Sequence, residues 1–319
     1  MNRALALADR LCGDIARHGV QLDPRATLDR GDAVALARPG RRSANRHARL
    51  VRAQDGWLAV NLARGEDIEL VPAWLGRPVR GDAWSAVTRD VRGMTAVEAR
   101  DRAALLGLPV SIVGEAPPRL PKPPVQAGGH PRAAPRVLDL SSLWAGPLCG
   151  AILAAAGAAV TKIESAARPD TTARSAPALD QSLNGAKARQ RLDFAQPRDR
   201  ARLAALIAEA DVLITSARAR AFVALGLDRD TVLAANPALI WVAVSGHGWD
   251  SPRVAFGDDA AAAGGLVRWS ASGAPEFLGD AVADPLTGLA AAAAVLGALA
   301  GGASGFIDAA MAGVAASAP

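Results

Sequence analysis

Residues 137–163, with the sequence VLDLSSLWAGPLCGAILAAAGAAVTKI, determine the fold class of this chain. Residues 137–140 form a short apolar run that predicts a buried strand. Residues 147–156 are rich in alanine and begin with proline, which favours the first turn of a helix, and residues 159–163 predict a second strand. A strand, a helix and a strand in this order form a unit whose two strands run parallel in one sheet.

The same alternation continues along the chain. Residues 200–210 and 229–235 predict helices, and the apolar runs 212–215 (VLIT) and 240–245 (IWVAVS) predict strands. Strands made of continuous apolar residues are typical of parallel sheets that are covered on both faces. We therefore predict an α/β fold with a Rossmann-like parallel sheet and helices on both of its faces.

A proline-rich stretch separates this repeating pattern from an N-terminal part. Residues 116–136 hold seven of the 21 prolines, which sustain neither a helix interior nor sheet pairing. We predict a linker there, between a smaller N-terminal α/β domain at residues 1–115 and a Rossmann-like domain at residues 137–319. In the smaller domain, residues 56–62 read as a buried strand and residues 96–106 as an amphipathic helix.

The composition is that of a folded protein in a reducing compartment. Half of the 319 residues are apolar and 21% are charged, a balance that excludes wholesale disorder. The two cysteines, Cys12 and Cys149, match no metal-ligand spacing and build no disulfide framework. The first residues carry charges every few positions, unlike a secretory leader. We expect a cytoplasmic protein that holds no metal.

The longest stretch without a charged residue, 285–307, is long enough to cross a membrane. It consists mostly of alanine and glycine, which contribute little to the free energy of transfer into lipid, and Pro285 and Thr287 interrupt it. We therefore predict a buried helix there and expect no membrane partner.

The net charge of +5 and the pI near 10.1 raise the question of nucleic-acid binding. The basic excess lies before residue 136, and its densest run of arginines contains no acidic and no aromatic residue. Surfaces that bind single strands interleave cations with aromatic side chains that stack on bases. We interpret the run as a solvent-exposed face, with phosphate capture as the alternative, and expect no nucleic-acid partner. It comprises Arg38, Arg41, Arg42, Arg46, Arg49 and Arg52.

A doubly wound sheet holds its ligands at the carboxyl ends of its strands. After the first predicted strand come residues 141–150, SSLWAGPLCG, which lack the first glycine of the dinucleotide-binding motif G-x-G-x-x-G. This difference argues against a nicotinamide cofactor. The N-terminus of the helix that follows Gly146 is still a candidate for holding a phosphate group.

A second candidate lies at residues 279–288, GDAVADPLTG. Asp284 stands directly before Pro285, which predicts an N-cap followed by proline at the first helical position. On these residues alone, the cap is favoured over a catalytic role. The two interpretations are compatible, because a carboxylate at a helix N-terminus is held in one orientation and the nearby amides stabilise charge that forms there during acyl transfer.

Several stretches resemble family III coenzyme A transferases, the CaiB/BaiF group, and follow the order of that family. The family opening V-L-D-L-S…A-G-P is similar to residues 137–147, and the V-A-D-x-x-T-G segment is similar to residues 282–288. The likeness extends to residue 308. The other matching stretches are 154–164 (AAAGAAVTKIE), 182–187 (SLNGAK), 211–214 (DVLI), 236–240 (NPALI), 245–248 (SGHG) and 305–308 (GFID).

The resemblance implies a CoA transferase that moves CoA between an acyl-CoA and a free carboxylic acid, with Asp284 as the nucleophile. Asp284 would form a mixed anhydride with the acyl group and then an aspartyl-CoA thioester, from which an acceptor acid takes the CoA. CoA would be a substrate. The residues that the resemblance places at CoA are Ala145, Gly146, Pro147, Asn184, Lys187, Ser216 and Arg218.

The order of segments differs from the usual one in that family. Members normally start at the V-L-D-L-S strand and continue through a Gly-rich loop into a small domain. Here residues 55–60 (DGWLAV) and 106–110 (LGLPV) resemble that small domain and come first, and the Gly-rich loop is not seen. We therefore expect a permuted or truncated domain order, with a homodimer or a complementary second subunit as the assembly.

Two alternatives stay open. The first is a non-catalytic CoA-binding or partner subunit of the same fold. The second is a 2-methylacyl-CoA racemase, which is less favoured because Gly257, Asp258 and Asp259 stand where racemases of this family carry a G-H-D pattern with its proton-shuttling histidine. His247, a lone histidine after a strand, favours a structural role.

Overall fold

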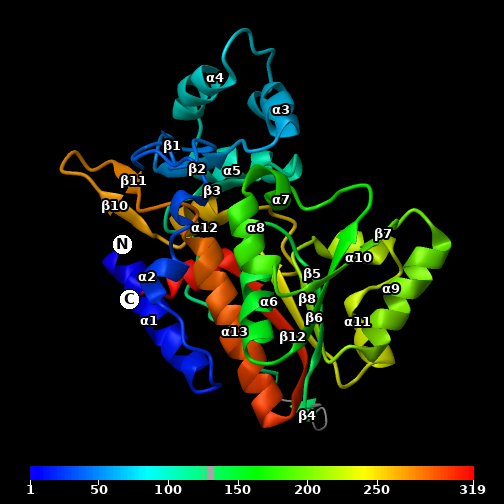
Figure 1. Ribbon diagram of the computed structural model, residues 1–319. Coiled ribbons are helices and arrows are strands. Elements are labelled where there is room, and N and C mark those ends of the chain that lie inside the picture. Colours follow the sequence, from blue (N-terminus) through cyan, green and yellow to red (C-terminus); the bar gives the residue numbers. More distant parts are fainter. Residues whose placement is uncertain (125, 128–132) are drawn as a thin grey trace.

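The computed structural model describes residues 1–124, 126–127 and 133–319. Its centre is a seven-stranded sheet with the strand order β4-β12-β9-β8-β5-β6-β7 (Figure 1). Six neighbouring strands are parallel, and β4 pairs antiparallel to β12 at one edge. The strands are β4 (Gln126–Ala127), β5 (Arg136–Leu140), β6 (Ala159–Ser165), β7 (Ala188–Leu192), β8 (Val212–Thr215), β9 (Ile240–Ser245) and β12 (Ala303–Ala310).

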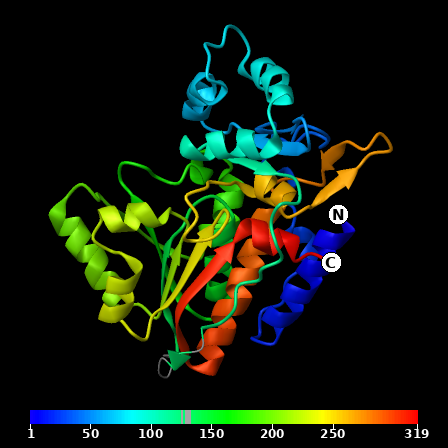
Figure 2. The ribbon, with the colours of Figure 1, turned by 180° about the vertical axis from the view of Figure 1, so that it is seen from behind.

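Side chains of the central strands alternate between two apolar layers. Val137, Ile214 and Val242 pack against one group of helices, and Leu138 and Leu213 pack against another. Figures 1 and 2 show helices on each face of the sheet. This arrangement confirms the predicted Rossmann-like sheet. The first layer holds α1 (Asn2–Ala16), α6 (Ala145–Ala155), α8 (Pro177–Asn184) and α13 (Ala283–Gly301), and the second holds α9 (Pro197–Glu209), α10 (Ala219–Ala224) and α11 (Arg229–Ala235).

The central helix of the first layer is α13, which packs between α1 and α6. Among the described residues it is the single helix long and apolar enough to cross a membrane by length and composition, but 72% of its apolar window is buried inside the protein. Its apolar character is therefore explained by its position over the sheet. Close packing with α6 requires Gly288, because a Cβ there would lie 2.7 Å from the carbonyl oxygen of Ala145.

A smaller α/β part precedes the main sheet in the sequence. Its three strands pair antiparallel in the order β1-β2-β3 and share an apolar core with three helices. The opposite face of this small sheet packs on α12 through Ala262. The elements are β1 (Ala48–Arg52), β2 (Trp57–Asn61), β3 (Val110–Ile112), α3 (Gly65–Leu75), α4 (Ala83–Asp90), α5 (Ala96–Leu105) and α12 (Gly257–Ala263).

Short elements complete the chain. They are α2 (Pro24–Thr27), the 3₁₀ turns Gly31–Ala33 and Val91–Gly93, α7 (Thr172–Ser175), β10 (Val267–Trp269), β11 (Pro275–Phe277) and α14 (Met311–Ala316). The domain boundaries at residues 115 and 137 stay a prediction. The contacts show that α1 packs on α13 of the main sheet rather than on the core of the small sheet.

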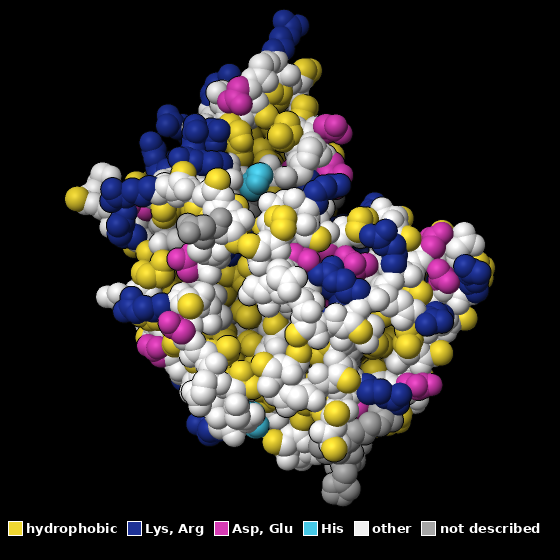
Figure 3. Space-filling model, in the orientation of Figure 1, with side chains coloured by type: hydrophobic (Ala, Val, Ile, Leu, Met, Phe, Trp, Pro, Cys, Tyr) yellow, Lys and Arg dark blue, Asp and Glu magenta, His cyan; other side chains and the backbone are white. Residues whose placement is uncertain are grey.

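The arginine run of residues 38–52 lies at the surface of the small α/β part. Figure 3 shows Lys and Arg side chains gathered over the region of β1, β2 and the β10–β11 hairpin. Two members of the run are partly covered by aromatic rings: Arg49 lies 4.4 Å from the ring centroid of Trp84, and Arg52 lies 5.6 Å from that of Trp57. Because five of the six arginines are exposed and Arg49 is half-buried, the run is largely a solvent-exposed face.

Candidate active site

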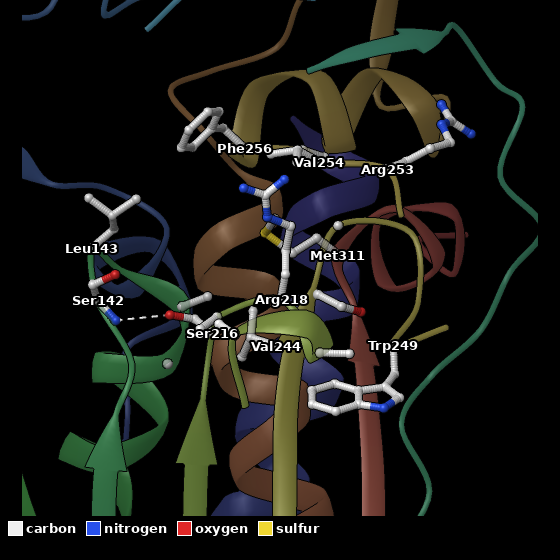
Figure 4. A pocket seen from close by; sticks show the side chains of 18 of the residues that line it. Ser142, Leu143, Ser216, Arg218, Val244, Trp249, Arg253, Val254, Phe256 and Met311 are labelled. Atoms are coloured by element: carbon white, nitrogen blue, oxygen red, sulfur yellow. Dashed lines mark hydrogen bonds between the residues drawn. The ribbon is translucent and has the colours of Figure 1, made fainter. Parts of the chain in front are cut away.

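A cavity of about 720 Å³ lies at the carboxyl ends of β5, β8, β9 and β12. This is the edge at which parallel α/β sheets hold their ligands. Figure 4 shows the Arg218 side chain extending from the end of β8 toward Val254 and Phe256. The backbone N–H of Ser142, after β5, donates a hydrogen bond of 3.0 Å to Ser216 Oγ, after β8, and so joins two of the loops that form the cavity (Figure 4).

Asp284 lines this cavity, near the start of α13. The predicted N-cap position is wrong by two residues: the helix begins at Ala283, and Asp284 is its second residue. The cause is the preceding turn, in which Ala281 has a φ of 45° and its carbonyl oxygen accepts a hydrogen bond of 2.8 Å from the Asp284 N–H. The helical turn therefore starts before Asp284. Its carboxyl group does not cap the helix and lies against Gly257 instead.

The Asp284 carboxylate rests against the main chain of Gly257, at the first residue of α12. The Gly257 amide favours the charged form of this carboxyl group, more weakly than the Arg30 charge does. A Cβ on residue 257 would lie only 2.2 Å from Asp284 Oδ2, so a side chain at this position would force the carboxylate away. Glycine is therefore required for the contact.

The surroundings of Asp284 raise its pKa to about 7. Burial is the main cause, because it disfavours the charged form; the positive charge of Arg30 acts in the opposite direction, and the carboxylates of Asp258 and Asp280 raise the pKa further. Near neutral pH, the group therefore exists in comparable amounts as a carboxylic acid and as a carboxylate. The carboxylate is the form that can act as a nucleophile.

Five arginines line the cavity and make it suited to an anion. Arg64 is paired with Asp67, and Arg253 with Glu115. Within the described part of the chain, the other three have no ion-pair partner. The pKa of Arg218 is lowered by burial and by the neighbouring positive charges of Arg220, Arg64 and Arg168, as expected where guanidinium groups are crowded. Phosphate groups bind such forked donors well. The three arginines are Arg168, Arg218 and Arg220.

A second cavity, of about 350 Å³, also contains Asp284 in its lining. Arg64, Leu143 and Phe256 line both cavities with it. The second cavity is bounded by polar and apolar side chains from both parts of the molecule, so Asp284 lies where two chambers meet. Its further lining includes Arg30, Asn45, His47, Asn61, Trp144 and Thr172.

The structure brings together most of the residues predicted from sequence. Ala145, Gly146, Ser216, Arg218 and Asp284 all line the larger cavity. Their roles toward CoA stay predictions at this point. No group of His, Cys, Asp and Glu within the described ranges has the arrangement of a metal site.

Three predicted CoA contacts are placed elsewhere. Lys187 Nζ donates hydrogen bonds to Asp139 Oδ2 at 2.7 Å, to the Pro147 carbonyl oxygen at 2.8 Å and to Asn184 Oδ1 at 2.9 Å. All four residues are buried, and none of them lines either cavity. The polar atoms of Pro147, Asn184 and Lys187 are therefore used to hold α6 and α8 to β5, which explains their presence without a CoA contact.

His247 is half-buried just after β9, and its Nε2 lies 3.2 Å from Ser111 Oγ of β3. Burial, with a smaller effect of the Arg253 charge, lowers its pKa to about 4. It does not line the cavity that its neighbours Gly246 and Gly248 line. A neutral histidine that links the two sheets agrees with the structural role that the sequence favours.

Several cavity residues were not identified from the sequence. Trp249 follows β9, so its position after a predicted strand was an available signal; Met311 follows β12, a strand that was not predicted. Arg64 follows β2 of the small sheet, and no pattern in the sequence connects it with Asp284. Its place at the site follows from the packing of the two parts of the molecule.

The family comparison agrees with this geometry. The family model described as CoA-transferase family III matches residues 134–318. The chain belongs to CoA-transferase family III. The family match covers the six parallel strands of the main sheet and Asp284, whereas β4 and the small sheet lie outside it.

Individual relatives are similar over the same region. An acyl-CoA transferase of Fusarium pseudograminearum is 31% identical over 184 residues, which are 51% of this chain and 40% of the relative. A succinate–glutarate CoA-transferase of Agrobacterium fabrum is 30% identical over 187 residues, 53% of this chain and 47% of the relative. A crystal structure of a CaiB/BaiF family protein from Brucella suis matches with a TM-score of 0.54 and 28% identity, over 59% of this chain and 55% of that one. The chain thus spans about half the length of these proteins, or less.

The buried ion pair of Lys187 and Asp139 predicts a large effect on stability. We expect Lys187→Ala to lower the free energy of unfolding by about 3–5 kcal/mol, because it leaves a buried carboxylate without its cation. Lys122 is exposed and offers a matched control, so Lys122→Ala should change the value by less than about 0.5 kcal/mol. Urea denaturation of the two variants measures this. Equal stability of both would contradict the structural role given to Lys187.

Asp259, next to the site on α12, predicts how stability depends on pH. Burial raises its pKa to about 8, so the folded protein keeps this proton where the unfolded chain releases it near pH 4. Stability therefore falls as the pH rises toward 8. Asp258 and Asp284 act in the same direction, and His247 opposes them only below about pH 6.5.

Between pH 6.5 and 8 we expect Asp259→Asn to flatten this decline by up to about 1.4 kcal/mol per pH unit. Asp101→Asn, at a position that is 60% exposed, is the control and should keep the wild-type slope. Denaturation at a series of pH values gives the slopes. A slope in Asp259→Asn as steep as that of the wild type would show that Asp259 is ionised in the folded state.

Proposed function

We propose that this chain transfers CoA between an acyl-CoA and a free carboxylic acid, with Asp284 as the group that is acylated. The observation that carries the proposal is the position of Asp284 at the junction of two cavities, one of them lined by arginines. Membership of CoA-transferase family III supports the reaction class. The larger cavity would hold the phosphate-bearing part of CoA, and the smaller one the acyl group.

The first half of the proposed reaction loads the enzyme. A carboxylate oxygen of Asp284 attacks the thioester carbonyl carbon, the C–S bond breaks, and CoA leaves as the thiolate. The product is a mixed anhydride of Asp284 and the acyl group. The thiolate then attacks the aspartyl carbonyl carbon, which forms an aspartyl-CoA thioester and releases the first acid as its carboxylate.

The second half reverses these steps with another acid. The acceptor carboxylate attacks the aspartyl thioester, CoA thiolate leaves, and a new mixed anhydride forms. The thiolate then attacks the acyl carbonyl carbon of this anhydride, which yields the new acyl-CoA and regenerates the Asp284 carboxylate. The charge is balanced in every step, because one carboxylate or thiolate is consumed for each one formed, so no proton donor is required.

The residues around Asp284 suit these steps. The main chain of Gly257 lies against the carboxyl group and favours its charged form, so the Gly257 N–H would stabilise negative charge that develops on the aspartyl oxygen when the thiolate attacks. Arg168, Arg218 and Arg220 are free of ion pairs with other described residues and would bind the phosphates of CoA. The volume of about 350 Å³ in the second cavity favours short acids.

Covalent labelling tests the proposal directly. We expect the wild-type protein, incubated with a panel of short acyl-CoA thioesters, to gain the mass of an acyl or CoA adduct that maps to Asp284. Asp284→Asn should form no adduct, because an amide is a far weaker nucleophile. Asp250→Asn, at an exposed position, is the matched control and should label like the wild type. Labelling of Asp284→Asn at the wild-type rate would refute the mechanism.

The pKa of Asp284 predicts how labelling depends on pH. Because only the carboxylate attacks, the rate should rise about tenfold per pH unit below pH 7 and level off above it. Rapid-quench mass measurements between pH 5.5 and 8.5 give this profile. A rate that is constant across the range would mean that the carboxyl group is ionised throughout, contrary to the effect of burial on its pKa.

A further inference from the structure

The turn that carries Asp284 is fastened by residues from the N-terminal part of the chain. Asn45 Nδ2 donates two hydrogen bonds, to Asp258 Oδ2 at 2.7 Å and to Asp280 Oδ1 at 2.9 Å. One amide group thus bridges two carboxylates on either side of the site. Asn45 lies outside residues 134–318, the region that the family model matches.

The orientation of this amide group is set by its other atom. Asn45 Oδ1 accepts hydrogen bonds from Ser43 Oγ at 2.7 Å and from the His47 N–H at 3.0 Å. Because Oδ1 of Asn45 accepts from two donors, its NH₂ group must face the two carboxylates. The whole hydrogen-bond network therefore fixes the orientation of the amide group.

Arg30 provides the positive charge of the same cluster. Its guanidinium group forms an ion pair with Asp280 and lies 5.0 Å from the ring centroid of Trp144. Arg30 and Asp280 are only 16% and 8% exposed, so water screens the pair weakly. Arg30 therefore offsets the negative charge that Asp258, Asp280 and Asp284 bring together.

A chain of hydrogen bonds connects Asn45 with Asp284. Asp258, which accepts from Asn45, also accepts from the Ala281 N–H at 2.8 Å. Ala281 in turn accepts at its carbonyl oxygen from the Asp284 N–H at 2.8 Å. Ala281 has a φ of 45°, in the left-handed region, which is unfavourable for an alanine and persists only where neighbouring groups hold it.

We propose that Arg30 and Asn45 are positioning residues for Asp284: they hold the turn of residues 279–284 and supply the charge that balances its carboxylates. Both residues also line the smaller cavity, but the role proposed here acts through the turn and its carboxylates and requires no bond to the reacting atoms. The inference rests on the proposed acylation of Asp284 for its catalytic consequence. It also assigns a role to the N-terminal segment, which completes a site whose nucleophile lies in the family-matched region.

The charge balance leads to a measurable shift. The charged groups that face Asp284 are Arg30, Asp258 and Asp280, and Arg64 lines both cavities with it. Arg30 is the positive charge that lowers the pKa of Asp284, whereas Asp258 and Asp280 raise it, so without the Arg30 charge the carboxyl group of Asp284 should lose its proton at higher pH. Arg30→Lys keeps the charge and should preserve the wild-type titration.

The test compares Arg30→Met, Arg30→Lys and Asn45→Ala with the wild type. The titration of Asp284 is followed by ¹³C NMR of side-chain carboxyl groups, with its signal identified by its loss in Asp284→Asn. We expect the midpoint to rise by about one pH unit in Arg30→Met and to return toward the wild-type value in Arg30→Lys. Arg25→Met, an exposed neighbour on α2, is the control and should leave the midpoint unchanged.

The labelling rate of Asp284 is measured on the same variants. Arg30→Met should label about tenfold more slowly at pH 6, in proportion to the lost carboxylate, and recover at high pH. Asn45→Ala should label more slowly at every pH, because the turn is no longer held. Partial unfolding of a variant lowers the amplitude of the NMR signal from the folded protein but leaves the midpoint of the Asp284 titration unchanged. The midpoint therefore separates a charge effect from a loss of fold.

The outcomes distinguish this inference from the proposed function. The positioning roles would be overturned if Asp284 titrates with the wild-type midpoint in Arg30→Met and is labelled at the wild-type rate in Asn45→Ala. This holds even if Asp284 is acylated. A wild-type protein that acquires no adduct at Asp284 would overturn the proposed function. In that case the NMR midpoints alone still decide whether Arg30 controls the carboxyl group of Asp284.

Discussion

The close contact between the Asp284 carboxylate and the main chain of Gly257 is the constraint on which the site depends. It exists because residue 257 has no side chain, since a Cβ would lie 2.2 Å from the carboxylate oxygen. The contact also requires that two helices keep their positions: α12 packs beneath the small sheet, and α13 packs against α6 through Gly288. Burial at this junction is what brings the pKa of Asp284 close to neutrality.

The two parts of the molecule contribute differently to this junction. The main sheet supplies the cavity at its carboxyl edge, and α13 supplies Asp284; the six parallel strands and α13 lie within the family-matched residues. The N-terminal part supplies Arg30, Asn45 and Arg64, whose charges and donors offset a cluster of buried carboxylates. Buried acids without such partners would be protonated or would destabilise the fold. The site is therefore shared between segments that are distant in the sequence.

The parallel sheet was predictable because its strands are continuous apolar runs between helices, as at residues 212–215 and 240–245. Ligand contacts were harder to assign. Ser216 and Arg218 were identified through the resemblance and do line the cavity, whereas Lys187 and Asn184, identified in the same way, are buried in a hydrogen-bonded ion-pair network. A polar side chain near a strand end can bind a ligand or stabilise the fold, and the sequence alone does not indicate which.

The sequence by itself determined the class of fold, the edge of the sheet at which ligands bind, and Asp284 as the candidate nucleophile. The fold class and the sheet edge follow from apolar periodicity, whereas the choice of Asp284 as nucleophile is what the resemblance to CoA-transferase family III implies. Only the tertiary structure decided that Asp284 follows the N-cap instead of occupying it, that Gly257 lies against its carboxylate, and that Arg30 and Asn45 bind the carboxylate of Asp280, more than two hundred residues away. Those contacts arise from packing between distant segments, which local residue preferences do not encode.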